Sequence, residues 1–177
     1  KSSKVFFNQL LAVETNSSCL VFMMKFPKFN LQKFEKSEGV QRLNLNVKLD
    51  NICRDTGFLV LDGHGVSHEI ITAQWKVVSD FFALSNEKKQ EVEVPYAGYP
   101  YGWIGPNKEA LAASKGEKTL PDLKESFNGG PLTIPVGIKD ARAYDFCYQL
   151  TLWPQIDGFK EAWCAYYREM ENLAKRV

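Results

Sequence analysis

The segment from Asp157 to Val177 carries the pattern that most constrains how this chain folds. Its apolar side chains recur at helical spacing, at Phe159, Trp163, Tyr166, Met170, Leu173 and Val177. The spacing predicts a long amphipathic helix with Asp157 as its N-cap. Burial of one such side chain stabilises a protein by ~1.5–3 kcal/mol, so this helix needs a packing partner. The partner is expected among the other elements of the chain or in a part outside these residues.

The composition is that of an ordinary globular protein. Of the 177 residues, 45% are hydrophobic and 24% are charged, which argues against disorder. The 22 Lys and Arg balance the 21 Asp and Glu, so a dedicated nucleic-acid surface is not expected. No apolar run approaches the ~18 residues of a membrane span. The 4 cysteines lie far apart, which favours a reduced, cytoplasmic setting.

Residues 1–23 differ from the rest of the chain. The first residue is Lys1, and the first methionines are Met23 and Met24. The segment contains no Arg and no small-residue cleavage site, which argues against a targeting segment. We expect 1–23 to be a poorly ordered leader or upstream read-through, with a targeting segment as the alternative. Residues 24–177 form the predicted folded domain.

The local patterns alternate between helix and strand and predict an α+β fold. Strands are expected at Phe26–Leu31, at Asp122–Phe127 and, fully buried, at Phe58–Leu61. Asn128–Pro154 is expected to be loop-rich, and the charges of Asp122, Lys124 and Glu125 are interpreted as a solvated strand face. One helix is predicted to end at Gly57, with an apolar face made of Leu45, Leu49, Ile52 and Cys53. A second is predicted to begin at its N-cap Ser67, with an apolar stripe made of Ile70, Ala73, Val77, Phe81 and Leu84. Short helical turns are expected at Ser85–Glu91 and Lys108–Ser114.

The two histidines offer one possible metal site. His64 and His68 are four residues apart, a spacing that can hold a metal ion on a helix face. However, glycines flank His64 and predict a turn, and a third ligand would have to come from Asp62 or Glu69. The simpler interpretation is a turn histidine bonded to backbone and a surface histidine. No nucleophile elbow, P-loop or dinucleotide fingerprint is present.

The stretch from Pro95 to Pro106 is rich in aromatic, Pro and Gly residues, which predicts a loop without regular structure. Its aromatic side chains can stack on a flat ligand or line an apolar pocket. We predict substrate contacts for Tyr99, Tyr101 and Trp103. The alternative for each is a packing role in a cover over the core.

Three stretches, in this order, resemble the amino-terminal region of the non-haem iron(II)/2-oxoglutarate dioxygenases, in the isopenicillin-N-synthase-like branch. They are residues 50–66, which contain C-R-D-T-G-F and H-G-V, residues 81–89, F-F-A-L-S-N-E-K-K, and residues 121–131, P-D-L-K-E-S-F-N-G-G-P. Phe26–Leu31, Tyr96–Trp103 and Trp153-Pro154 are similar to further family segments. Several motifs in register make coincidence an unsatisfactory explanation.

The resemblance implies a double-stranded β-helix (jelly-roll) core preceded by this α+β region. In that family two histidines and a carboxylate hold Fe(II), and 2-oxoglutarate and O2 serve to oxidise a small organic substrate. The H-G-V turn histidine, here His64, is not a ligand in the family. The family's H-x-D motif is absent, because Val66 and Ile70 stand two residues after His64 and His68. Its R-x-S motif is absent as well, because no Arg of the sequence has Ser two residues on.

We therefore expect the amino-terminal part of such an oxidoreductase, with most of the jelly roll missing and acting as the packing partner. Neither catalytic residues nor metal ligands are assigned, and the chain alone is expected to bind neither Fe(II) nor 2-oxoglutarate and to be inactive. No nucleic-acid or membrane partner is expected. The alternative function is a non-catalytic module that binds a small molecule or a protein.

Overall fold

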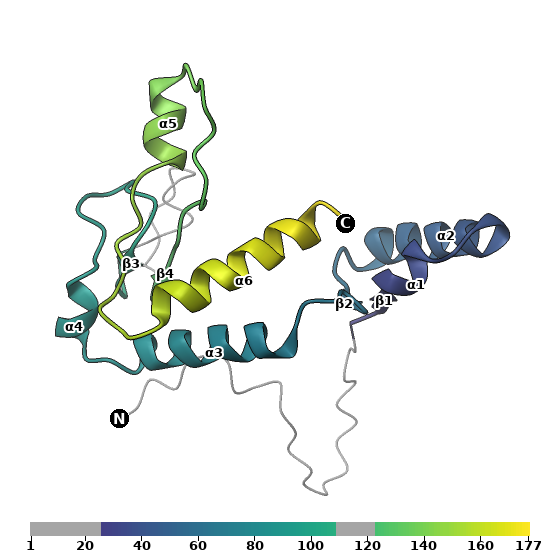
Figure 1. The fold of residues 1–177 in the computed structure, drawn as a ribbon, viewed down its shortest axis with the longest axis horizontal. Helices are drawn as coiled ribbons and strands as arrows, with labels where there is room; N and C mark the ends of the chain where they lie inside the picture. Colours follow the sequence, from purple (N-terminus) through teal and green to yellow (C-terminus); the bar gives the residue numbers. More distant parts are fainter. Residues whose placement is uncertain (1–25, 109–122) are drawn as a thin grey trace, which may run out of the picture. The chain divides into compact units, whose positions relative to one another are not determined.

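The structure is a computed structural model of the chain, and it describes residues 26–108 and 123–177. The chain divides into two compact units, 1–62 and 63–177 (Figure 1). Among the described residues, no helix has the length and apolar character that a membrane crossing requires. The predicted leader 1–23 lies outside the described residues, as does most of the predicted helical segment Lys108–Ser114.

The first unit joins a small parallel sheet to two helices. The elements are β1 (Lys28–Asn30), α1 (Leu31–Glu35), α2 (Gly39–Asp55) and β2 (Val60–Asp62). Strand β1 pairs in parallel with β2, with Phe29 opposite Leu61. Phe29, Leu31 and Ile52 are buried and form the small core of the unit.

Helix α2 confirms one predicted helix and extends it toward the N-terminus. Ile52 is buried, and Leu45 and Leu49 are half-buried, as the spacing predicts. Cys53, assigned to the same face, is exposed. Gly57 has the left-handed φ of 66° that a helix end requires.

Both predicted strands of this unit need correction. The first strand ends at Asn30, because its side chain accepts a hydrogen bond from the Lys33 amide at 2.7 Å and starts α1. The run Phe58–Leu61 is not a buried strand: β2 begins at Val60, and the exposed fractions of Phe58 and Val60 are 69% and 44%. Among the described residues β2 pairs only with β1, and the side chains of Phe58 and Val60 stay largely exposed beside this small sheet.

The second unit is built on two long helices. Helix α3 (His68–Phe82) and helix α6 (Phe159–Ala174) lie side by side (Figure 1). The other elements are α4 (Asn86–Gln90), β3 (Trp103–Ile104), β4 (Ser126–Phe127) and α5 (Ala141–Cys147), and β3 pairs antiparallel with β4. The buried core consists of Val77, Phe81, Val92, Trp103 and Phe159.

The capping pattern of α3 is confirmed. The Ser67 hydroxyl accepts a hydrogen bond from the Ile70 amide at 3.4 Å and donates one to Glu69. This hydroxyl, together with the helix N-terminus, holds the pKa of Glu69 below its usual value. Two members of the predicted stripe differ, since Ala73 is exposed and Leu84 lies beyond the helix end.

Helix α6 is confirmed as the long amphipathic helix, but its predicted ends are wrong. The N-cap is Gly158 rather than Asp157, because the chain enters the helix through a left-handed residue with φ 73°. L-residues with side chains rarely adopt this conformation, so glycine takes the cap position. Val177 lies beyond the helix end.

The predictions for the remaining segments hold in part. The aromatic loop is not wholly irregular, since it contains β3, and the strand expected at Asp122–Phe127 is reduced to β4. Helix α5 interrupts the segment expected to be loop. Asp140 caps it by accepting hydrogen bonds from the Arg142 and Ala143 amides, but no residue of α5 is buried. With seven residues α5 makes less than two turns, which is too short for an apolar period to reveal a helix in the sequence.

Candidate functional site

The three aromatic side chains predicted to contact substrate all donate hydrogen bonds to other groups of the chain. Tyr99 donates a hydrogen bond from Oη to the Leu150 carbonyl at 2.6 Å. Tyr101 donates to the Cys147 carbonyl at 2.5 Å. Trp103 donates from Nε1 to Oε2 of Glu125 at 2.8 Å. These bonds join the loop to chain segments far away in sequence.

Trp103 lies much deeper than the two tyrosines. It is 2% exposed and belongs to the core of the second unit, whereas Tyr99 and Tyr101 are half-buried. The packing role that the sequence left open is the role the structure shows for Trp103. Substrate contact by Tyr99, Tyr101 and Trp103 stays a prediction, and the tyrosines have the greater access to a ligand.

Two glycines bring the segment after β4 into close contact with aromatic rings. A Cβ atom on Gly129 would lie 2.5 Å from Nε1 of Trp163, and one on Gly130 would lie 2.6 Å from the Tyr101 ring. The Gly130 amide donates to the Thr151 hydroxyl at 2.9 Å. Only glycine allows this approach without displacing the rings. The contact was not predicted from the sequence, although the paired glycines were visible in N-G-G-P.

The tyrosine hydroxyl groups around the loop are partly desolvated. Burial raises the pKa of Tyr99, Tyr101 and Tyr167 above the usual value. For Tyr101, the neighbouring Cys147, Tyr167 and Tyr148 raise the pKa further. Tyr99 and Tyr101 are neutral hydrogen-bond donors, to the carbonyl groups of Leu150 and Cys147. Tyr167 of α6 is a member of this group that the sequence did not single out.

We expect Tyr101→Phe to lower the free energy of unfolding by about 0.5–1.5 kcal/mol near pH 7, through loss of the bond to Cys147. Because the folded-state pKa of Tyr101 is raised, the unfolded chain ionises first as pH rises above about 10. The stability contributed by the phenol is lost there, so the variant and the parent should converge. Urea unfolding at both pH values measures this. The exposed Tyr96→Phe serves as control, and an equal loss in both variants would contradict the assignment.

The histidines lie where the simpler interpretation places them. His64 Nδ1 accepts a hydrogen bond from the Val66 amide at 3.0 Å, and the His64 carbonyl accepts one from Arg176 at 2.8 Å. His68 is exposed on α3, with Nε2 3.4 Å from the Thr72 hydroxyl. Within residues 26–108 and 123–177, no group of three or more His, Cys, Asp or Glu is placed to hold a metal ion. The alternative His64–His68 site thus has no third ligand there.

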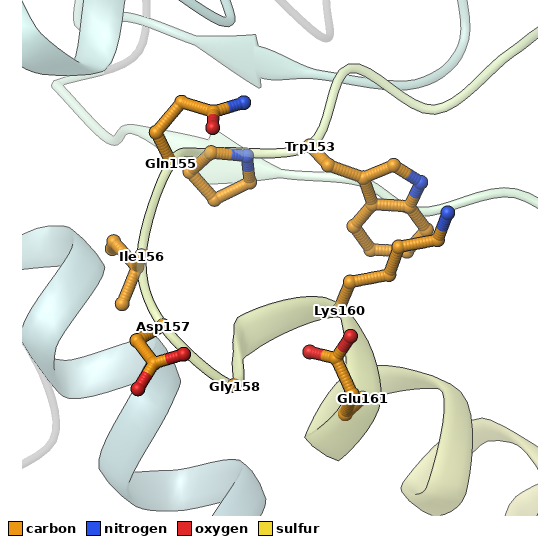
Figure 2. A pocket seen from close by; sticks show the side chains of 8 residues that line it. Trp153, Gln155, Ile156, Asp157, Gly158, Lys160 and Glu161 are labelled. Carbon is orange, nitrogen blue, oxygen red and sulfur yellow. The ribbon is translucent and has the colours of Figure 1, made fainter.

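An open hollow of about 410 Å³ lies at the start of α6. Figure 2 shows Trp153, Lys160 and the carboxylate of Glu161 near one another, with the carboxylate of Asp157 across the hollow from them. Lys160 Nζ lies 5.8 Å from the centroid of the Trp153 ring. The residues that line the hollow all belong to the continuous stretch 153–161, and their side chains carry charges of both signs. The hollow therefore offers no preference for one ligand charge.

Residues 26–156 match the family described as the N-terminal region of the non-haem dioxygenase in morphine synthesis. Homoarginine-6-hydroxylase of Arabidopsis thaliana is 36% identical over 96 residues, which cover 53% of this chain and 26% of that protein. Validamycin A dioxygenase of Streptomyces hygroscopicus subsp. limoneus is 29% identical over 155 residues, or 85% of this chain and 40% of that protein. The chain thus spans well under half the length of these relatives.

The structure agrees with a solved fold. A full-length Neurospora crassa protein, crystallised in complex with alpha-KG, matches with a TM-score of 0.64 at 21% identity, over 85% of this chain and 44% of that chain. At this identity the likeness shows the fold, which is the mixed helix and strand region predicted from the sequence. The resemblance drawn from the motifs is confirmed, and the chain belongs to the family of non-haem dioxygenase N-terminal regions.

Proposed function

We propose that this chain is the amino-terminal part of an iron(II)/2-oxoglutarate-type oxidoreductase that uses O2 to oxidise a small organic substrate. The observation that carries the proposal is the family match over residues 26–156. Relatives named as 2-oxoglutarate-dependent dioxygenases support it, among them one from Didymella fabae that is 30% identical over 137 residues. The likeness to a fold crystallised with alpha-KG is consistent with the same cofactor.

The described residues do not fit an iron site. No cluster of three metal-ligating side chains lies among them, and the sequence offers only 2 histidines, neither with Asp two positions on. We infer that Fe(II) and 2-oxoglutarate are held by residues outside this chain. No chemical step is therefore assigned to the residues described here, and the chain alone is expected to be inactive.

The proposed role of these residues is to support the substrate-binding region of the enzyme and to pack against the jelly roll that binds the iron. In the first unit, Phe26 and Phe58 are in edge-to-face contact at 6.1 Å, yet they are 54% and 69% exposed. Together with Val60 they form an apolar face on the small sheet. Such a face usually marks an interaction surface, and we propose the missing jelly roll as its partner.

A turnover assay tests the proposal. The chain is incubated with Fe(II), 2-oxoglutarate and O2, and succinate is measured against a protein-free blank, with validamycin A dioxygenase and its substrate as positive control. We expect succinate at the level of the blank, because the chain contributes no iron site. Succinate well above the blank, abolished by a chelator, would contradict the assignment of the iron site to residues outside the chain.

Sedimentation and melting curves address the alternative of a non-catalytic binding module. Such a module should be monodisperse and bind a defined ligand, which should raise its melting temperature. The proposal instead expects exposed apolar surface and limited solubility, since the face of Phe26, Phe58 and Val60 is uncovered.

A further inference from the structure

A buried ion pair lies at the centre of the second unit. Lys89 of α4 is 4% exposed, and its Nζ donates to Oε1 and Oε2 of Glu125 at 2.9 and 2.7 Å. The Trp103 indole donates to the same carboxylate at 2.8 Å, and Lys89 Nζ lies 5.6 Å from its ring centroid. Side chains from α4, from β3 and from the residue before β4 thus meet at one carboxylate.

Stability alone gives no reason for this arrangement. Removing charges from water is costly, and a buried pair can often be replaced by apolar side chains without loss of stability. The pair adds geometric specificity, because the carboxylate accepts hydrogen bonds from one ammonium group and one indole N–H in a defined arrangement. A buried polar contact of this kind can select one alignment among several similar ones.

The alignment concerned is that of β3 and β4. Trp103 pairs with Phe127, and the Gly102 carbonyl accepts a hydrogen bond from the Asn128 amide at 3.0 Å. A slip by one residue would turn the side chains of β4 to the opposite face. Each strand has two residues, so its few backbone bonds specify the register weakly. Glu125 stands next to β4 and binds Trp103, which opposes such a slip.

The same register determines the position of the aromatic loop, which contains the predicted substrate contacts. Tyr101 precedes β3 and its ring lies against Gly130, which follows β4. We infer that Lys89 and Glu125 are positioning residues that hold Tyr101 against the Gly129–Gly130 segment by fixing the β3–β4 register. The functional meaning of this position rests on the proposed function, whereas the positioning itself can be tested without any activity.

The first test compares melting temperatures of Lys89→Met, Glu125→Gln and the double variant. Glu125→Gln leaves a buried ammonium without its carboxylate, and we expect Tm to fall by on the order of 10 °C. Lys89→Met should lower Tm less, because the carboxylate that it leaves without a partner can still be hydrated. The Glu125 side chain is 23% exposed, whereas that of Lys89 is 5% exposed. The double variant should recover most of the loss. Lys76→Met, which breaks the exposed pair with Asp80, is the matched control and should change Tm by a few °C at most.

The second test reads positioning separately from stability. In the double variant, hydrogen exchange at the Asn128 and Gly130 amides should become about tenfold faster, whereas exchange at the Ala162 amide of α6 should stay unchanged. Lys89→Met gives the same comparison if the double variant does not fold. Unchanged exchange at both amides would overturn the inference. This outcome would not contradict the proposed function, because the exchange experiment measures no turnover. Conversely, succinate formation by the chain would contradict the proposed function but not the positioning role of Lys89 and Glu125.

Discussion

Replacement of Phe81 by alanine is expected to lower the free energy of unfolding of the second unit by about 3–5 kcal/mol. Phe81 has no exposed surface and lies on α3 at the contact with α6. Its ring centroid lies 5.2, 5.1 and 5.8 Å from those of Phe82, Phe127 and Phe159. The substitution removes all three ring contacts and leaves a cavity that the helices cannot close without moving. Urea unfolding followed by tryptophan fluorescence measures the loss.

The matched control for this experiment is Phe146→Ala in α5. Phe146 is 67% exposed in the same unit, so its truncation should cost less than about 0.5 kcal/mol. Similar losses in the two variants would mean that Phe81 is not the centre of the core. The packing of α3 on α6 would then need another explanation.

The second large effect is expected from Gly129→Ala, at about 1–3 kcal/mol of destabilisation. The added Cβ would lie 2.5 Å from Cε2 and Nε1 of Trp163. This ring cannot move away freely, because its centroid lies 5.3 Å from that of Phe127 and 6.0 Å from that of Phe159. The clash must therefore shift the backbone after β4 or displace the indole. A fall in Tm with altered tryptophan fluorescence is the expected result.

A double-mutant cycle with Trp163→Leu gives the control for the glycine. If the cost of Gly129→Ala comes from the indole, most of it should disappear once Trp163 is replaced by the smaller leucine. Strictly additive losses would show that the clash with the indole is not the reason for the glycine. The same design applies to Gly130 and the Tyr101 ring.

The sequence predicted those elements whose burial follows a regular period. Helix α6 and the centre of α3 were found because Phe159, Val77 and Phe81 lie on faces that are buried in the fold. Helix α5 was missed because its seven residues make less than two turns, too few for a helical period to be recognised. The run Phe58–Leu61 was judged buried because it is apolar, but exposure depends on what covers β2, which no local pattern encodes.

The candidate site was predicted less completely than the fold. The aromatic loop was visible as a cluster of tyrosines and tryptophan, because its members are close in sequence. Glu125 was assigned to a solvated face, yet it binds Lys89, 36 residues away in the chain. Charge pairs of this kind cannot be predicted from one sequence, since alternation of charged residues has the same appearance in exposed and buried strands.

If the proposed function is correct, this chain is the amino-terminal part of an iron-dependent dioxygenase, and the metal ligands lie in residues outside it. The most direct measurement is mass spectrometry of the native protein, captured with an antibody against residues 26–177. We expect peptides of this chain to map to a longer polypeptide that also carries an H-x-D motif, a distal histidine and R-x-S. A native polypeptide that contains these residues and lacks all three motifs would contradict it.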